Sequence, residues 1–291
     1  MDVRIIGNTQ DPWARAVLEG MPRKAKTKTA LLIGSGPQIF ATIFFRIARY
    51  RLVWLAEESA RSGIAKRLIR TMSRFAHAII APNQATEAQY LKAGVSDKKL
   101  VLVYPPCEMR TSDAKDSKTF TIACDGETSI DHGLGMIMRA VRDAKDILGD
   151  IVLIIGGAIA DRGRIEWLAQ ELNMRDSVKL VPARGYGWIA ASDVFLFMRN
   201  DSALVPLSLA HALAAGKPAI TNDALPHREF VVHHKNGILL KDANSDMLSQ
   251  ALINLGRKPE WLAELGRESA QFAQERFSPE LVRKKIEALI P

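Results

Sequence analysis

Glycines begin and end a polar segment, Gly126-Glu-Thr-Ser-Ile-Asp-His-Gly133, which lies between a predicted strand and a predicted helix. The first N–H groups of a helix have no partner within the helix and carry the positive end of its dipole, so this position can bind a phosphate. Two interpretations stay open. The segment is a phosphate-binding loop, or it is an ordinary strand-to-helix turn that uses glycine for its backbone freedom.

Two adjacent carboxylates, Glu57 and Glu58, follow the predicted strand at 52–55. Ligands of open parallel sheets bind at the carboxyl ends of strands, so one of these side chains could hold a substrate hydroxyl or act as a base. Alternatively they begin the next helix, where acidic residues favour the dipole. The segment Gly34-Ser35-Gly36 has only two glycines of a dinucleotide fingerprint and is weak evidence by itself.

The sequence shows no clear pattern of a metal site or of a disulfide framework. The six histidines include His227, His233 and His234, but no His-x3-His or carboxylate pattern accompanies them. The two cysteines, Cys107 and Cys124, are far from any ligand spacing, so a zinc site or a disulfide framework is not indicated. We therefore expect no metal and no bound cofactor, and a reducing compartment.

Basic residues gather in the first part of the chain. Residues 1–110 carry 18 Lys and Arg against 8 Asp and Glu, whereas residues 111–291 carry 22 against 24. The asymmetry indicates an anionic partner of the N-terminal part, namely a phospholipid surface, a lipid phosphate or nucleic acid, or else a solvated basic face. Nucleic acid ranks last, because interleaved aromatic residues are missing. Four cations share one side of the predicted helix 61–75 and could dock on an anionic membrane: Lys66, Arg67, Arg70 and Arg74.

Length and patterning predict two α/β domains. A chain of 291 residues suits two domains, and apolar runs of strand length alternate with helical patterns throughout. The N-terminus lacks the pattern of a signal peptide and the longest apolar stretch, 38–55, contains three arginines, so we expect a cytoplasmic protein. Predicted strands are 3–6, 30–33, 52–55, 78–80, 100–103, 120–124, 152–155, 178–181, 194–197, 219–221 and 238–240. Predicted helices are 13–20, 37–50, 63–75, 84–93, 134–148, 162–173, 206–215, 246–255 and 260–276, followed by a basic helix.

Several collinear segments carry a family resemblance. They read Ala191-Ser-Asp-Val-Phe-Leu-Phe197, Val205-Pro-Leu-Ser-Leu-Ala-His-Ala-Leu-Ala-Ala-Gly-Lys-Pro-Ala-Ile-Thr-Asn-Asp223, Asn236-Gly-Ile-Leu-Leu240 and Arg276-Phe-Ser278. They are similar to AADVFVLPS…EGLPLSLLEAMAAGKPVVATD, to "nGlLv" and to "rFSwe" of the retaining family 4, or glycosyl transferases group 1, enzymes of GT-B fold. The first half matches more weakly, at 74–83 and 101–105, and resembles a divergent, shortened acceptor domain.

The resemblance implies two Rossmann-like domains that face each other across a cleft. Residues 1–110 would form the acceptor-side domain, 111–118 a linker and 119–275 the nucleotide-sugar donor domain, with a C-terminal helix at 276–291 crossing back to the first domain. The activity implied is transfer of a sugar from a UDP- or GDP-sugar to a lipid-linked or glycan acceptor, at the inner face of the membrane. The alternative is a catalytically degenerate GT-B protein that serves as a binding or partner subunit.

The resemblance also assigns site residues, several of which depart from the family pattern. Glu127 and His132 stand where the family has a phosphate-binding arginine and lysine, and Ala203 and His211 stand where it has a Glu-x7-Glu pair. The imidazole of His211 could still hydrogen-bond a ribose hydroxyl. Candidate catalytic residues are Glu57, Glu58 and Asp201; candidate donor-binding residues are Gly126, Glu127, His132, Gly133, Ser202, Ala203, Leu204, Val205 and His211; and candidate acceptor-side residues are Gly34, Ser35 and Gly36.

Overall fold

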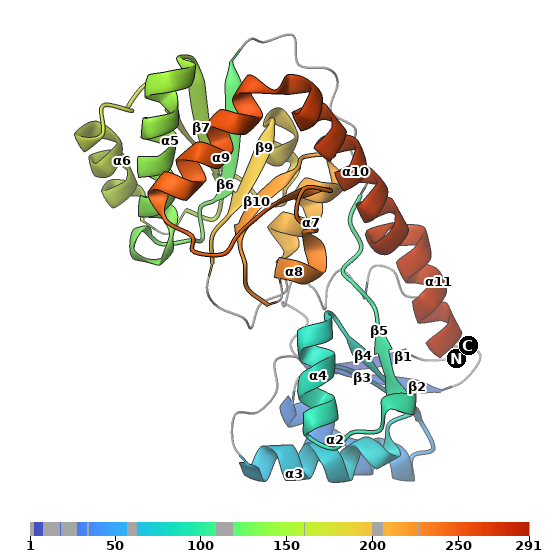
Figure 1. Cartoon of the computed structure of the whole chain (residues 1–291). Coiled ribbons are helices and arrows are strands. Elements are labelled where there is room, and N and C mark those ends of the chain that lie inside the picture. The colour runs from blue at the N-terminus through green and yellow to red at the C-terminus, as the bar shows by residue number, and fades with distance from the viewer. Residues whose placement is uncertain are drawn as a thin grey trace. The chain divides into compact units, whose positions relative to one another are not determined.

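The computed structural model describes residues 3–7, 18, 28–33, 35–56, 63–108, 119–159, 161–199, 206–225 and 227–290 (Figure 1). These residues form two compact units. The first contains those up to Pro106 together with those from Arg276 onward, and the second contains those from Cys107 to Glu275. The expected linker at 111–118 and most of the expected helix at 13–20 lie outside the described residues.

The first unit is built on a five-stranded parallel sheet in the order β1-β2-β3-β4-β5. Because the spatial order follows the chain order and parallel crossovers are right-handed, the three helices that connect β2 through β5 lie on one face of the sheet. The strands are β1 (Val3–Gly7), β2 (Thr29–Ile33), β3 (Arg51–Leu55), β4 (Ala78–Ala81) and β5 (Leu100–Leu102). The helices between them are α2 (Ser35–Ile47), α3 (Gly63–Met72) and α4 (Gln84–Lys92).

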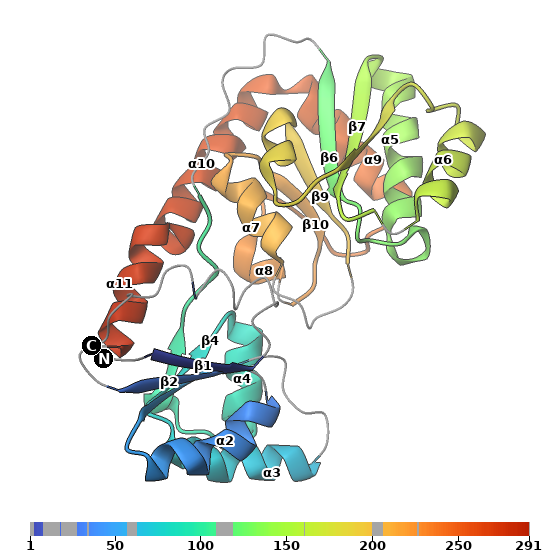
Figure 2. The same cartoon turned by 180° about the vertical axis from the view of Figure 1, so that it is seen from behind.

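Successive side chains of the central strands alternate between two cores. Leu32 and Trp54 belong to a cluster with residues of α2, α3 and α4. Leu31 and Val53 belong to a second cluster with Val282, Ile286 and Ile290 of the C-terminal region. Helix α11 (Pro279–Leu289) therefore covers the face of the sheet opposite α2 and α3, as both views show (Figures 1 and 2).

The Arg276-Phe-Ser segment fixes the start of α11. Phe277, the last residue of helix α10 (Pro259–Phe277), is fully buried, and its ring lies edge-to-face on Tyr104 with centroids 5.5 Å apart. The hydroxyl of Ser278 accepts a hydrogen bond from the N–H of Leu281 at 3.4 Å and caps α11. Pro279 fits the first helical position because its missing N–H needs no partner there.

Helix α2 differs from its predicted range of 37–50. It begins at Ser35 and ends at Ile47, because Arg49 adopts a left-handed conformation with φ 58°. The N–H of Tyr50 then donates to the carbonyl of Phe45 at 2.9 Å, and their rings lie 5.0 Å apart. This is a Schellman termination with its apolar contact, built on a residue that is not glycine.

The second unit has a six-stranded parallel sheet in the order β11-β10-β9-β6-β7-β8. Helix α8 (His227–Phe230) was not predicted, because four residues are too few to show a helical period. The strands are β6 (Phe120–Asp125), β7 (Ile151–Gly157), β8 (Val178–Pro182), β9 (Val194–Phe197), β10 (Ala219–Asn222) and β11 (Gly237–Leu240). The longer helices are α5 (Leu134–Leu148), α6 (Arg162–Glu171), α7 (Leu207–Ala214), α9 (Ser245–Arg257) and α10.

The prediction of two parallel α/β domains is confirmed, and every predicted strand is present within one or two residues of its expected bounds. Continuous apolar runs predict such strands well because helices cover both faces of a parallel sheet. Within the described residues, no helix combines the length and the apolar character that a membrane crossing requires.

Candidate functional site at the edge of the second sheet

Strand order in the second unit creates a switch point between β6 and β9. The chain leaves β6 toward β7 and β8, then returns to pair β9 with the other side of β6 and continues to β10 and β11 (Figure 2). Neighbouring connections therefore leave the sheet in opposite directions, which opens a crevice at the carboxyl ends of these two strands. Asp125 ends β6 at this edge, and Met198 and Arg199 follow β9.

Gly133 packs against the end of β9. Its φ is 131°, and a Cβ at this position would lie 2.3 Å from the carbonyl oxygen of Met198. Only glycine tolerates both the backbone conformation and this close approach. Gly133 precedes α5, so the contact brings the start of a 15-residue helix to the switch point.

The first turn of α5 presents N–H groups at this edge. The N–H of Leu134 donates to the carbonyl of Ser129 at 3.2 Å, and the N–H of Ile137 donates to that of Gly133 at 3.0 Å. By helix geometry the N–H groups of Gly135 and Met136 have no carbonyl partner within the helix. Together with the helix dipole they favour an anion.

Glu127 and Arg199 form an ion pair across the switch point. The carboxylate Oε2 of Glu127 lies 3.8 Å from a guanidinium nitrogen of Arg199, whose side chain is only 17% exposed. The backbone N–H of Glu127 donates to the carboxylate of Asp125 at 3.0 Å. Burial and the negative charge of Asp125 raise the pKa of Glu127, whereas Arg199 acts in the opposite direction. The site thus holds a carboxylate that is poorly stabilised and a cation close to it.

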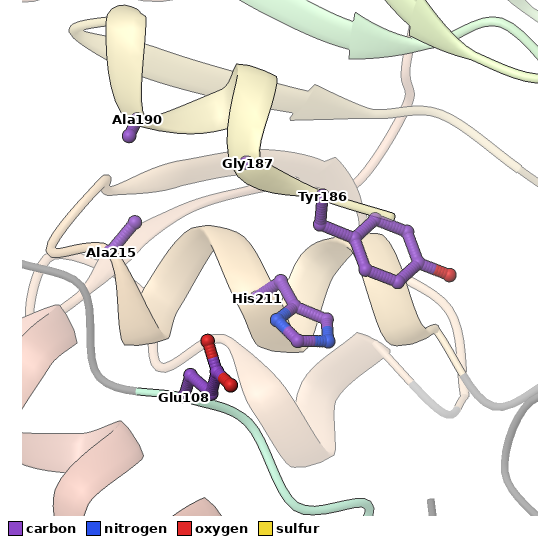
Figure 3. Close-up of a pocket in the computed structure, with 6 residues that line it drawn as sticks. All are labelled: Glu108, Tyr186, Gly187, Ala190, His211 and Ala215. Atoms are coloured by element: carbon purple, nitrogen blue, oxygen red, sulfur yellow. The ribbon is translucent and has the colours of Figure 1, made fainter. Parts of the chain in front are cut away.

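His211 of α7 stacks on Tyr186 beside this edge. The two rings are 4.4 Å apart and inclined by 22° (Figure 3). Burial raises the pKa of Tyr186, and the nearby carboxylates of Asp125 and Glu127 raise it further, so the phenol stays neutral. A cavity of about 60 Å³ adjoins the stack, which is room for a few water molecules only. Its lining residues are Glu108, Tyr186, Gly187, Ala190, His211 and Ala215.

A tryptophan anchors the segment that carries Tyr186. The indole of Trp188 lies on β7 so closely that a Cβ on Gly156 would be 2.3 Å from its Cδ2 atom. The indole N–H donates to the carbonyl of Gly185 at 3.1 Å. These contacts fix the turn before the 3₁₀ helix Gly187–Ala191 and thereby the position of the Tyr186 ring.

The structure brings together only part of the predicted site. Gly126, Glu127 and Gly133 lie at one sheet edge, with His211 on the neighbouring helix α7. For Ser35, Gly36 and His132 the backbone alone is described, and the first two lie inside α2 rather than in a loop before it. The other candidates lie outside the described residues: Gly34, Glu57, Glu58, Asp201, Ser202, Ala203, Leu204 and Val205.

Sequence reasoning missed Arg199, Asp125 and Tyr186. Arg199 comes two residues after a correctly predicted strand, which was a usable signal for a residue at the carboxyl edge. Arg199 comes close to Glu127 only because β9 pairs with β6, however, and local sequence patterns do not predict which strands are neighbours. Tyr186 reaches His211 through a tertiary contact between segments 25 residues apart in the chain, counted from their numbers.

His227 and His233 make hydrogen bonds within the second unit, and both cysteines are buried. The imidazole of His227 is buried, with Nδ1 2.8 Å from the Thr221 hydroxyl, and Nδ1 of His233 accepts from the N–H of Leu239. Burial raises the pKa of both thiols, Cys107 and Cys124. Among the described side chains, no three His, Cys, Asp or Glu gather in a way that could hold a metal ion.

The family model for glycosyl transferases group 1 matches residues 108–272, more than half of the chain. A protein of Methanocaldococcus jannaschii, named as a glycosyltransferase, is 24% identical over 213 residues, which are 69% of this chain and 54% of that protein. EpsD of Bacillus subtilis, also named as a glycosyltransferase, is 26% identical over 167 residues, or 55% of this chain and 42% of its own. The chain spans about half the length of these curated relatives.

Solved glycosyltransferase structures share the fold. HepE of Anabaena in complex with UDP has a TM-score of 0.76 at 18% identity, over 89% of this chain and 77% of its own. The same protein has also been solved with UDP-glucose. A glycosyltransferase of Rickettsia africae has a TM-score of 0.76 at 10% identity, over 99% of this chain and 97% of its own.

Replacing Gly133 by alanine should destabilise the second unit. The added Cβ meets the Met198 carbonyl, and alanine is strained at the φ of 131° that this position has, so we expect the free energy of unfolding to fall by roughly 1–3 kcal/mol. Urea unfolding followed by circular dichroism measures the change. Gly163→Ala is the matched control, because nothing lies within 4 Å of the added Cβ in the first turn of α6. Equal stability of the two variants would contradict the close packing.

Proposed function

We propose that this chain, which belongs to the glycosyl transferases group 1 family, transfers a sugar from a nucleotide-sugar donor that binds at the β6–β9 edge of the second unit. The observation that supports the proposal is that the residue before α5, Gly133, packs on the Met198 carbonyl, next in the chain to Arg199, whose guanidinium pairs with Glu127 of the loop before α5. The start of α5 and the guanidinium both favour an anion, and the diphosphate is the anionic part of such a donor. The family match covers the elements that form this edge.

Arg199 replaces, in function, the arginine that the family pattern has at position 127. The family pattern has a serine at position 199, whereas this chain has the arginine there, directly after β9, and a glutamate at position 127. Without donor, Glu127 lies 3.8 Å from Arg199 and holds the guanidinium near the edge. With donor, the guanidinium turns to the diphosphate and forms charge-assisted hydrogen bonds. The positive charge of Arg199 thereby offsets the repulsion between the Glu127 carboxylate and the diphosphate.

His211 and Tyr186 hold the nucleoside. In the family pattern the second glutamate, at position 211, contacts the ribose hydroxyls, and a neutral imidazole also offers one donor and one acceptor. Stacking on Tyr186 fixes the plane of the His211 ring and so the direction of its nitrogens. We propose a UDP-sugar as the donor; the UDP and UDP-glucose complexes of HepE support this choice by analogy of fold.

The chemical step breaks the bond between C1 of the sugar and the β-phosphate oxygen, which leaves with the electron pair. The acceptor hydroxyl forms the new bond to C1, and its proton passes to the departing phosphate. Negative charge grows on the leaving group, where Arg199 and the N–H groups of α5 stabilise it. Retention of configuration, and roles for Glu57, Glu58 and Asp201 in orienting the acceptor, are part of the proposal.

A degenerate binding subunit is the second candidate, favoured by Ala203 in place of the first glutamate of the family pair. Such a protein would bind the donor and not turn it over. Release of free UDP from UDP-sugars, with and without glycan or lipid-linked acceptors, separates the two functions. Binding with no release across all acceptors supports the subunit, and release supports the enzyme.

Replacing Arg199 by glutamine should weaken donor binding by about 10- to 100-fold, because a charge-assisted hydrogen bond contributes roughly 1.5–3 kcal/mol. Calorimetric titration with a panel of UDP- and GDP-sugars measures the affinity. Arg162→Gln, in the same unit but in an exposed pair with Glu166, is the matched control and should bind like the original protein. The proposal fails if no nucleotide sugar binds, or if both variants bind equally.

Donor affinity should rise as the pH falls toward the raised pKa of Glu127, above its ordinary value of 4.5. Protonation removes a negative charge beside the diphosphate and releases Arg199, so we expect up to about tenfold tighter binding. The titration uses UDP-glucose rather than UDP, because a terminal phosphate has a pKa near 6.

The variant Glu127→Gln isolates this effect, since every other titratable group is the same in both proteins. It should bind UDP-glucose at pH 8 as tightly as the original protein does at low pH, with a flatter pH profile. Folding stability should depend on pH with the same sign. Because the pKa of Glu127 is raised in the folded state, its contribution to folding stability is fully present below pH 4.5 and is lost as the pH rises through the raised pKa. A profile unchanged by the substitution would rule out Glu127 as its cause.

A further inference from the structure

Several large apolar side chains of helix α2 are exposed to solvent. Phe40, Phe44 and Ile47 are 83%, 66% and 78% exposed, and Ile43 between them is 51% exposed. Their spacing of three and four residues places them on one side of the helix. The opposite side, with Thr42 and Phe45, is buried against the sheet. Helix α2 is therefore apolar on a face that no described residue of its own unit covers.

Helix α3 extends this apolar face and borders it with positive charge. It packs beside α2, on the same side of the sheet (Figures 1 and 2), and its Ile64 is 77% exposed. Three exposed cations of α3 and one in the 3₁₀ helix Ser73–Phe75 follow at helical spacing, and within the described part of the chain none of them pairs with an acidic side chain: Lys66, Arg67, Arg70 and Arg74. We call these nine residues, from Phe40 to Arg74, the α2–α3 surface.

The charge of the α2–α3 surface is of one sign. Neither α2 nor α3 contains an aspartate or glutamate, and the turn after α2 adds Arg49. Monomeric proteins rarely expose a contiguous apolar patch of more than a few hundred Å², so a patch of several phenylalanines and isoleucines indicates a partner. Protein interfaces place few charges near their apolar centre. Phenylalanine and isoleucine beside an acid-free row of cations are instead typical of helices that lie in a membrane interface.

We propose that the α2–α3 surface docks on an anionic phospholipid membrane. Phe40, Phe44, Ile47 and Ile64 enter the boundary between headgroups and acyl chains, and the cations of α3 bind lipid phosphates. Both signals are needed, because reversible anchoring by one of them alone is weak. The contact lies wholly in the first unit and needs no donor. It is thus independent of the proposed transferase activity, and either can fail without the other.

Flotation of the full chain with vesicles tests the proposal. The vesicles contain phosphatidylcholine alone, or phosphatidylcholine and phosphatidylglycerol at a ratio of about two to one. We expect binding to the anionic vesicles, weakened by added salt, and little binding to the neutral ones. One variant carries Phe40→Ser and Phe44→Ser, and a second carries glutamine at Lys66, Arg67, Arg70 and Arg74. Each should bind anionic vesicles at least about tenfold more weakly.

Matched controls remove the same chemistry from the second unit. Trp167→Ser takes away an aromatic side chain that is 62% exposed on α6. A four-fold glutamine variant at exposed cations removes the same net charge: Arg162, Arg175, Lys179 and Lys241. Both controls should float like the original chain. Because all substituted residues are exposed, unchanged circular dichroism and thermal unfolding verify that each variant is folded.

Three results would overturn the proposal. The first is no binding of the original chain to anionic vesicles at low salt. The second is an equal loss of vesicle binding in the control variants, which would attribute the binding to net charge and general hydrophobicity rather than to the α2–α3 surface. The third is an original chain that forms a dimer in sedimentation and does not float with vesicles, while the Phe40→Ser, Phe44→Ser variant is a monomer. That result would assign the surface to a second copy of the chain.

Discussion

Pairing of β6 with β9 is the constraint on which the candidate site depends. It makes two strands neighbours that are about 70 residues apart in the chain, and it turns their carboxyl ends into a crevice. Gly133 can then lie on the Met198 carbonyl, which sets the start of α5 beside the residue after β9. Without that pairing, the start of α5 and Arg199 would not lie at the same edge of the sheet.

Under the proposed function, Glu127 and Arg199 have to be considered together. A carboxylate at position 127 repels a diphosphate if it is considered alone. The nearby Arg199 alters that balance, because the guanidinium both neutralises Glu127 and can move to the ligand. Burial and the charge of Asp125 raise the pKa of Glu127, and Arg199 acts in the opposite direction.

Sequence alone predicted the fold far better than the site. Every strand could be found, since buried parallel strands are continuous apolar runs, and the polar residues around them mark the turns. Local pattern did not reveal that Arg49 would end α2 in a left-handed conformation, nor that Phe277 would pack on Tyr104. The spacing also placed Glu127 and Gly133 in one loop. Arg199 and Tyr186 were not predicted, because strand pairing brings the first to the site and ring stacking the second. Both contacts join segments that are distant in the chain.

A crystal structure of the chain with UDP-glucose would show directly where the diphosphate binds. We expect the diphosphate at the β6–β9 edge, with one oxygen within about 2.7–3.2 Å of the Arg199 guanidinium and another at that distance from an N–H group in the first turn of α5. The Glu127 carboxylate should have moved away from Arg199, or should share the guanidinium with the diphosphate. The proposed donor site would be wrong if the nucleotide bound elsewhere on the second unit, or if it bound at this edge while Arg199 stayed on Glu127 and touched no phosphate oxygen.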